Sequence, residues 1–186
     1  MKYVLFNKPY GVLCQFTDAQ GRPTLKDYID IPGVYSVGRL DMDSEGLLFL
    51  TDDGNINSSF SDPSNKVFKK YLVQVEGIPD ERELDKLRRG ILIQGEKTLP
   101  AFVSRLSGDP VLWPRPKPVR FRKKVPTSWL EISIREGRNH QVKKMTAAAG
   151  LPCLRLVRTS IGDLELGDLR PGEYKKIEKP SLTPSL

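Results

Sequence analysis

The chain has 186 residues, 38% of them hydrophobic and 28% charged, a composition typical of a globular protein. Its formal net charge of +7 at pH 7 indicates a polyanionic partner. The apolar runs at 3–6 and 46–50 are too short for a signal peptide or a membrane span, so we expect a cytoplasmic protein without a membrane partner. Cys14 and Cys153 match no disulfide or metal pattern and are interpreted as reduced thiols.

Short strands are expected along most of the chain. The segment at 2–8 is apolar, and the continuously apolar segment at 46–51 is expected to be buried on both faces. Alternation of apolar and polar residues predicts two further strands, at 69–77 and 129–136. Weaker patterns favour three more, at 100–106, 152–158 and 173–178.

Two segments have the pattern of short amphipathic helices. Residues 79–90 begin with a proline and acids and place Leu84 and Leu87 on one face. Residues 139–150 have Asn139 as the expected N-cap and Gly150 as the expected stop. Because strands and helices do not alternate regularly, we expect an α+β fold with a largely antiparallel mixed sheet and flanking helices. One domain over 1–180 and a loose tail at 181–186 are expected.

A proline-rich basic arm, WPRPKPVRFRKK at 113–124, contains six Lys or Arg residues. Its prolines exclude a regular helix or a central strand. Two interpretations stay open: a solvated loop, or an arm that follows a phosphate backbone while Trp113 and Phe121 stack on bases. The basic residues assigned to RNA contact in the second case are Arg115, Lys117, Arg120 and Arg122.

The segment GRLDMDSEGLLFLTDDG at 38–54 begins with an acidic loop, residues 38–45, which places Asp41, Asp43 and Glu45 just before an apolar run. The spacing of the acids matches the start of an EF-hand, but β-like flanks replace the required helices and disfavour calcium. A hydrolytic triad would need the only histidine, His140, and the nucleophile elbow Gly-x-Ser-x-Gly is missing from the sequence.

Three interpretations of the acidic loop remain after these exclusions. Asp41 could act with a neighbouring acid as a glycosidase pair. It could act alone as a catalytic carboxylate, which must stay ionised while buried and therefore needs a cation such as Arg39 or one of those in 138–144. It could also simply cap a turn before a strand.

Taken together, the motifs resemble the bacterial ribosomal RNA pseudouridine synthases of the RsuA/RluB/RluE/RluF type. The segment at 38–54, which contains the acidic loop, is similar to the catalytic motif of that family. Further similar segments follow in the order expected for the family, at 7–25, 66–77, 134–162 and 169–177. Because the catalytic opening starts at Met1, without an S4-type domain before it, the resemblance is closest to the short RluE-like members, which act on large-subunit ribosomal RNA.

The resemblance implies a role for each candidate residue. Asp41 is the catalytic aspartate, Tyr71 lies against the target base, and Lys143 is the basic partner of Asp41. The resemblance also assigns Arg39 to the flipped-out nucleotide, Leu156 to the pocket and Arg158 to support of the acidic loop. Expected RNA contacts outside the arm are Arg135, Arg138 and Lys144. Asp43 and Glu45 are expected to organise the loop, by capping N–H groups or pairing with Arg39.

The implied reaction isomerises uridine to its C-linked form, so neither a redox cofactor nor a metal is expected. Attack of Asp41 on C1′ and proton removal from C2′ both stay open. The expected partner is a ribosomal RNA stem-loop with a flipped-out uridine, free or in an assembly particle, bound by a monomer. The alternative functions are a non-catalytic RNA-binding or ribosome-assembly protein on the same fold and a carboxylate glycosidase.

Overall fold

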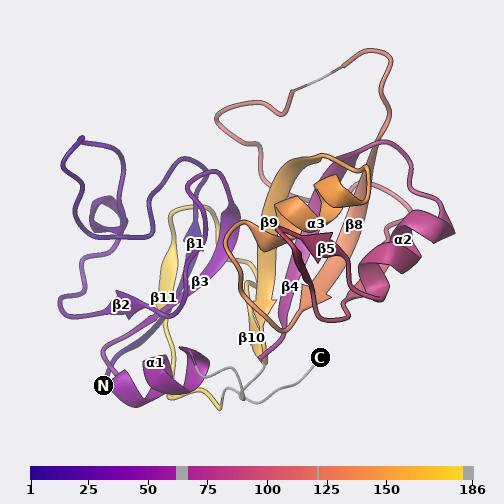
Figure 1. Ribbon diagram of the computed structural model, residues 1–186. Coiled ribbons are helices and arrows are strands. Elements are labelled where there is room, and N and C mark those ends of the chain that lie inside the picture. Colours follow the sequence, from indigo (N-terminus) through magenta and orange to yellow (C-terminus); the bar gives the residue numbers. More distant parts are fainter. Residues whose placement is uncertain (62–66, 121, 182–186) are drawn as a thin grey trace. The chain divides into compact units, whose positions relative to one another are not determined.

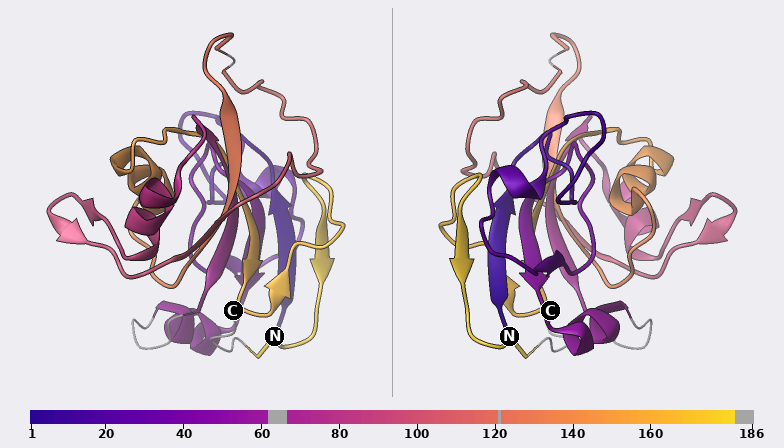
Figure 2. Two further views of the ribbon diagram at one scale, coloured as in Figure 1. Left: turned by 90° about the vertical axis from the view of Figure 1, so that its right-hand side faces the viewer. Right: turned by 90° about the vertical axis from the view of Figure 1, so that its left-hand side faces the viewer.

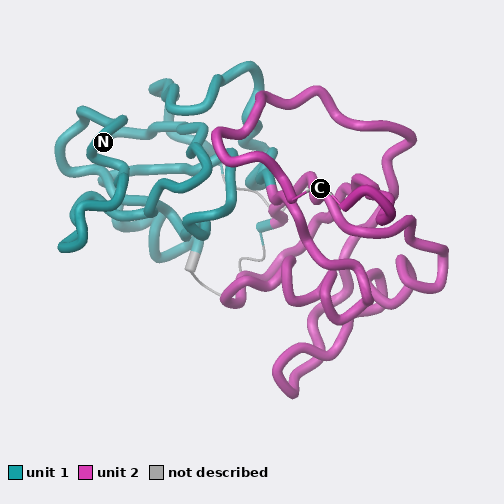
Figure 3. Tube along the Cα trace, turned by 90° about the horizontal axis from the view of Figure 1, so that it is seen from above, with its two compact units in different colours: residues 1–67, 157–186 teal, residues 68–156 magenta. Residues whose placement is uncertain are grey.

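The computed structural model describes residues 1–61, 67–120 and 122–181 (Figure 1). Two compact units are present, one formed by residues 1–67 with 157–186 and the other by residues 68–156 (Figure 3). Most strand pairs are antiparallel, one pair is parallel, and three α-helices accompany the strands in the described ranges. The α+β class with a largely antiparallel mixed sheet is therefore confirmed.

The first unit is built around two buried strands. β1 (Tyr3–Lys8) pairs antiparallel with β3 (Glu45–Thr51), and every residue of both strands is buried. The prediction that the apolar run at 46–51 is a strand buried on both faces is confirmed. β11 (Tyr174–Lys176) covers the other edge of β1, and both lie side by side in the two views of Figure 2.

Shorter elements complete the first unit. The carboxyl-terminal part of β9 (Cys153–Ile161) pairs with β3 in parallel, through Glu45 with Val157 and Gly46 with Arg158. The remaining elements are the 3-10 helix η1 (Leu25–Asp27), β2 (Tyr35–Ser36), α1 (Gly54–Ser61) and β10 (Leu164–Glu165). The parallel pair fixes the end of the acidic loop, because Glu45 is both its last acid and the first residue of β3.

The second unit contains an antiparallel sheet with two helices on one face (Figure 2). Its strands are β4 (Lys69–Glu76), β8 (Thr127–Ile134) and β7 (Phe102–Arg105), with β8 in the middle. Tyr71, Val73 and Val75 are buried, whereas the residues between them are partly exposed, which confirms the predicted alternation of β4. A small hairpin, β5 (Leu92–Ile93) with β6 (Glu96–Lys97), lies beyond the helices.

The two predicted helices are present, and one starts differently from the prediction. α2 (Glu81–Arg88) begins with a capping box between Asp80 and Glu83, and it buries Leu84 and Leu87 as predicted. α3 (Gln141–Ala148) has His140 rather than Asn139 at its N-cap, so the predicted cap is wrong. His140 has a left-handed backbone, with φ of 55°, and its side chain makes no capping hydrogen bond.

The proline-rich arm has neither a helix nor a strand in its described residues, as the prolines predict. Phe121 and most of the predicted tail, 182–186, lie outside the described residues.

Candidate active site

Asp41 lies in a tight turn of the first unit, after β2 and before β3. The backbone N–H of Ser44 donates to the carbonyl of Asp41 at 3.1 Å, and the Ser44 hydroxyl lies 3.5 Å from Oδ2 of Asp41. Ser44 is fully buried, whereas Asp41 is half-buried. The turn that the sequence suggested is therefore present, and it ends one residue before the buried strand β3 begins.

A buried lysine supports this turn. Lys8, the last residue of β1, is fully buried, and its ammonium donates to the carbonyls of Val12 at 2.8 Å and Pro9 at 2.9 Å. A third, longer bond of 3.3 Å reaches the carbonyl of Met42, inside the acidic loop. The backbone N–H of Gly11 donates to the same Met42 carbonyl at 2.8 Å. The opening segment of the chain therefore contacts the acidic loop through two hydrogen bonds to the Met42 carbonyl, one from a side chain and one from the backbone.

The charge of Lys8 is coupled to the acids of the loop. Burial lowers the pKa of Lys8 from 10.5 to about 8, because the ammonium loses its hydration. Electrostatic interactions with Cys14, Glu45, Asp43 and Asp41, in decreasing order, oppose this shift. Glu45 is itself fully buried. The acids of the loop therefore favour the charged form of the buried Lys8.

Arg158 braces the strand that follows the acidic loop. Its guanidinium is buried, and Nε donates to the carbonyl of Leu47 at 2.8 Å. Gly46 has φ of 102°, and a Cβ at this position would lie 2.2 Å from the carbonyl oxygen of Arg158. Only glycine therefore permits the close parallel contact between β3 and β9. Arg158 therefore contacts β3, the strand that follows the acidic loop, through its side chain and its backbone. In the same unit, Arg39 is exposed.

The other candidate residues belong to the second unit. Tyr71 is 7% exposed and lies in the middle of β4, opposite Ile132 of β8. Lys143 lies in the first turn of α3 and is half-buried. Leu156 is buried in the amino-terminal part of β9. Rigid elements, a strand or a helix, thus hold Tyr71, Lys143 and Leu156, whereas Asp41 and Arg39 lie in a loop.

The basic arm is attached to the second unit by arginines. Arg115 donates to the carbonyls of Leu154 at 3.4 Å and Pro118 at 3.2 Å, and also to that of Lys117. Arg155 donates to the carbonyl of Trp113 at 2.9 Å and lies over the Trp113 ring at 5.9 Å.

Two kinds of arm residue can therefore be distinguished. Arg122 makes an ion pair of 3.3 Å with Glu76 of β4, so Arg122, like Arg115, anchors the arm. Among the residues that the structure describes, the exposed basic residues of the arm for which no such anchoring contact is seen are Lys117, Arg120, Lys123 and Lys124.

In the described ranges of the chain, no cluster of three or more histidine, cysteine or acidic side chains could hold a metal ion. The same described ranges contain no helix that is long and apolar enough to cross a membrane.

Residues 2–148 match the model of a family described as RNA pseudouridylate synthase. The chain belongs to this family. It is therefore an enzyme, an isomerase that converts uridine to pseudouridine in RNA. The expected resemblance is confirmed, and the acidic loop, β4 and α3 lie within the matched range.

Curated relatives are similar over nearly the whole chain. The ribosomal large subunit pseudouridine synthase E of Vibrio parahaemolyticus is 53% identical over 95% of this chain and 74% of its own length. The enzyme of the same name from Xanthomonas campestris pv. campestris is 52% identical over 98% of both chains. The ribosomal large subunit pseudouridine synthase B of Bacillus subtilis is 37% identical over 94% of this chain and 67% of its own length.

A solved structure supports the fold. The crystal structure of a pseudouridylate synthase superimposes with a TM-score of 0.78 and 34% identity, and the match covers 95% of this chain and 70% of that one. Human RNA pseudouridylate synthase domain containing 1 has the same fold, with a TM-score of 0.59 at 16% identity.

Sequence reasoning missed two features of the site. The first is Lys8, whose only signal is its place between an apolar strand and Pro9. The second is Gln141, a buried glutamine at the start of α3 that makes hydrogen bonds with both ends of its amide. Both residue types are usually exposed, so periodicity gives no reason to choose them.

Proposed function

We propose that this enzyme modifies a uridine of large-subunit ribosomal RNA and that Asp41 is its catalytic aspartate. The observation that supports this substrate is the similarity to the large-subunit synthases E. More than half of the aligned residues are identical, over at least 95% of the chain. The structure of the acidic loop supports the choice of Asp41, since Lys8 donates to the carbonyl of Met42 in its turn and Arg158 donates to the carbonyl of Leu47 in the strand that follows. Such contacts hold a carboxylate in one place.

The reaction breaks the bond between N1 of uracil and C1′ of ribose and forms a bond between C5 and C1′. C5 loses its proton and N1 gains one, so the overall reaction transfers no electrons. Asp41 acts at the sugar, either by attack on C1′ or by removal of the proton on C2′. Both routes need an ionised carboxylate, and we assign the stabilising positive charge to Lys143.

The remaining roles concern the base and its nucleotide. We assign Tyr71 to the detached uracil, because a ring fixed on a strand can hold the base flat while it rotates. Leu156 adds an apolar wall, and Arg39, which is exposed, binds the nucleotide. Flipping the uridine out of its stack costs a few kcal/mol, which phosphate contacts of the basic residues offset.

The proposal includes the setting of the reaction. The substrate is a stem-loop, presented by free RNA or by an assembly particle in the cytoplasm, and the enzyme acts as a monomer. We also propose that residues 1–180 serve as one catalytic domain.

Tritium release from C5-labelled RNA tests the substrate. The wild-type protein is incubated with large-subunit transcripts, small-subunit transcripts and precursor particles of the large subunit. Release from large-subunit RNA or its particles, with none from small-subunit RNA, is the expected result. Release from small-subunit RNA alone would overturn the assignment of the substrate.

A further inference from the structure

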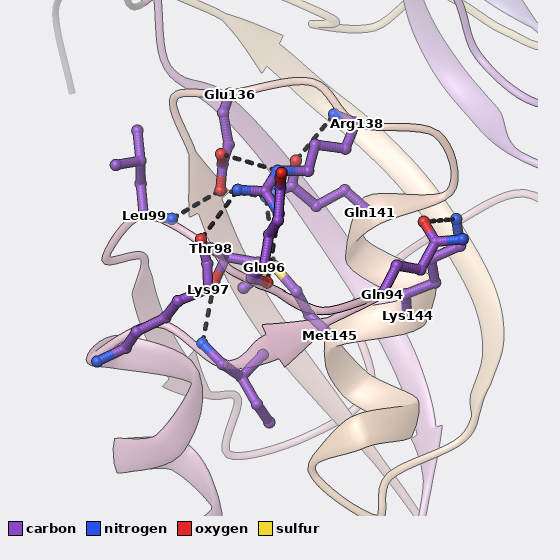
Figure 4. A network of polar contacts seen from close by, with 11 residues as sticks. Gln94, Glu96, Lys97, Thr98, Leu99, Glu136, Arg138, Gln141, Lys144 and Met145 are labelled. Carbon is purple, nitrogen blue, oxygen red and sulfur yellow. Dashed lines mark hydrogen bonds and ion pairs between the residues drawn. The ribbon is translucent and has the colours of Figure 1, made fainter.

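The loop that leads into α3 is joined to the β5–β6 hairpin by a network of polar contacts (Figure 4). The loop covers residues 135–140 and ends at the left-handed His140. Lys143, the proposed partner of the catalytic aspartate, is the third residue of the helix that follows. The network therefore bears on the direction in which Lys143 points.

Gln141 closes the loop on itself. Its side-chain oxygen accepts a hydrogen bond from the backbone N–H of Arg138 at 2.9 Å, and its Nε2 donates to Oε1 of Glu136 at 2.6 Å. The side chain is buried, and its Nε2 also lies 3.7 Å from the sulfur of Met145. Because His140 makes no capping hydrogen bond through its side chain, Gln141 supplies the order that a usual N-cap residue gives to a helix start.

Glu136 connects this loop to a second segment. Its Oε1 also accepts a hydrogen bond from the backbone N–H of Leu99 at 2.8 Å, just after the hairpin. Its Oε2 lies 3.4 Å from Nε of Arg138. The Glu136 side chain is only 16% exposed, so it is a largely buried acid with three partners from two segments. Such a group fixes the positions of all its partners.

Arg138 links the loop to the hairpin itself. Its Nη2 donates to the carbonyl of Lys97 at 2.9 Å, and its Nη1 lies 3.4 Å from the carbonyl of Glu96 and 3.6 Å from its carboxylate. Together with Glu136, these partners contact all three nitrogens of the guanidinium group. The expected contact of Arg138 with a phosphate would compete with these bonds, which favours a structural use of the residue.

The hairpin makes one more contact with the helix. Its two-residue turn, Gln94 and Gly95, has positive φ values of 51° and 85°, as a tight hairpin turn requires. Gln94 Oε1 accepts a hydrogen bond from the ammonium of Lys144 at 2.8 Å. The network therefore holds α3 at Gln141 and at Lys144, on both sides of Lys143.

We propose that Gln141, Glu136 and Arg138 are positioning residues that aim Lys143 at its reaction partner, with the β5–β6 hairpin as their support. The inference rests on the role of Lys143 in the proposed function. It predicts that loss of the network slows the chemical step without weakening RNA binding, because in this proposal all three residues have partners within the protein and no contact with the substrate. An RNA contact through Arg138 would give the opposite result.

The test measures single-turnover tritium release at saturating RNA, together with RNA affinity at several salt concentrations. Gln141→Ala and Arg138→Ala are each expected to slow the reaction roughly ten- to hundredfold, as misplacement of a catalytic group does. The dissociation constant and its salt dependence are expected to stay unchanged. The matched control is Gln74→Ala on β4. The Gln74 amide makes a long, exposed contact of 3.5 Å with the Thr127 hydroxyl, so this variant is expected to react at the normal rate.

A double variant distinguishes positioning from a general structural role. If Gln141 acts through Lys143, the combination Lys143→Ala with Gln141→Ala is no slower than Lys143→Ala alone. Rate losses that multiply would overturn the inference, as would weaker RNA binding with a smaller salt slope in Arg138→Ala.

Thermal unfolding identifies variants that do not fold, and Gln141→Glu then serves as the second variant. It keeps the shape of the side chain and the acceptor for the Arg138 N–H, but it places an oxygen where Nε2 donates to Glu136. The same rate loss in folded Gln141→Glu supports positioning, and a normal rate overturns it. Absence of release by the wild type, or full release by Asp41→Ala, would instead mean that the proposed function is wrong.

Discussion

Lys8 is a buried residue whose side chain contacts the backbone of the acidic loop. A fully buried ammonium is unfavourable unless it finds acceptors, and Lys8 finds three backbone carbonyls as well as the charges of nearby acids. One of these carbonyls belongs to Met42, the residue after Asp41. Sequence patterns could not identify Lys8, because lysine at the end of a strand is normally exposed. The sequence did single out Asp41 as a candidate, through its place in a motif.

The lowered pKa of Lys8 makes a prediction about stability. Between about pH 8 and pH 10 the unfolded chain binds the Lys8 proton and the folded chain has lost it, so the free energy of unfolding rises with pH. The expected contribution is about 2 kcal/mol over this range. Above pH 10 the raised pKa of Tyr3 acts in the opposite direction. Urea unfolding at a series of pH values measures the effect.

Two variants complete the Lys8 experiment. In Lys8→Met this rise should disappear, whereas Lys26→Met, at an exposed lysine, should keep it. An equal rise in Lys8→Met and the wild type would show that other groups cause it.

Elements with a clear period or a long apolar run were predictable. The strand at 46–51, the alternating strand at 69–77 and the helix at 79–90 are present with ends that differ by one or two residues. The short elements were missed, because β5 and β6 have two residues each and α1 has the polar sequence GNINSSFS. Neither pattern carries a periodic signal. The start of α3 was misplaced because its order comes from Gln141, inside the helix, rather than from an N-cap.

The arm is the element for which the structure adds most to the sequence prediction. Arg115 and Arg122 were expected to bind RNA, and the structure shows that both make contacts that attach the arm to the second unit, while Arg122 is still exposed. Prolines prevent the arm from pairing as a strand, so these side-chain contacts are what order it. We therefore test the proposed RNA contacts of the arm at its exposed basic residues, Lys117, Arg120, Lys123 and Lys124.

Neutralising the exposed arm residues should weaken RNA binding. The variant replaces Lys117, Arg120, Lys123 and Lys124 with alanine. Each lost phosphate contact is expected to lower the slope of log K against log salt by about 0.7 to 0.9. Binding titrations at several salt concentrations measure this slope, and Lys175→Ala with Lys176→Ala, exposed on β11, is the control. An unchanged slope would mean that the arm does not bind RNA.

At the scale of the whole molecule, the reaction is that of the family, whereas the contacts that support the proposed site are seen only in the structure. The family, the fold class and the isomerase activity could be predicted, because several motifs occur in the order of the family and their residues carry the resemblance. The supports of the site could not, since they arise from contacts between segments far apart in the sequence, such as Glu136 with Leu99 or Arg158 with Leu47. The catalytic role of Asp41 remains the central claim.

The most direct test of that claim is the rate of tritium release by Asp41→Asn, measured beside the wild type with large-subunit RNA or its precursor particles. Asparagine keeps the size of the side chain and removes the carboxylate. Asp30→Asn, at an exposed aspartate of the same unit, is the matched control. The account predicts no detectable release by Asp41→Asn, with RNA affinity and folding unchanged, and normal release by Asp30→Asn. Release by Asp41→Asn at the wild-type rate would contradict it, because the reaction would then proceed without the carboxylate.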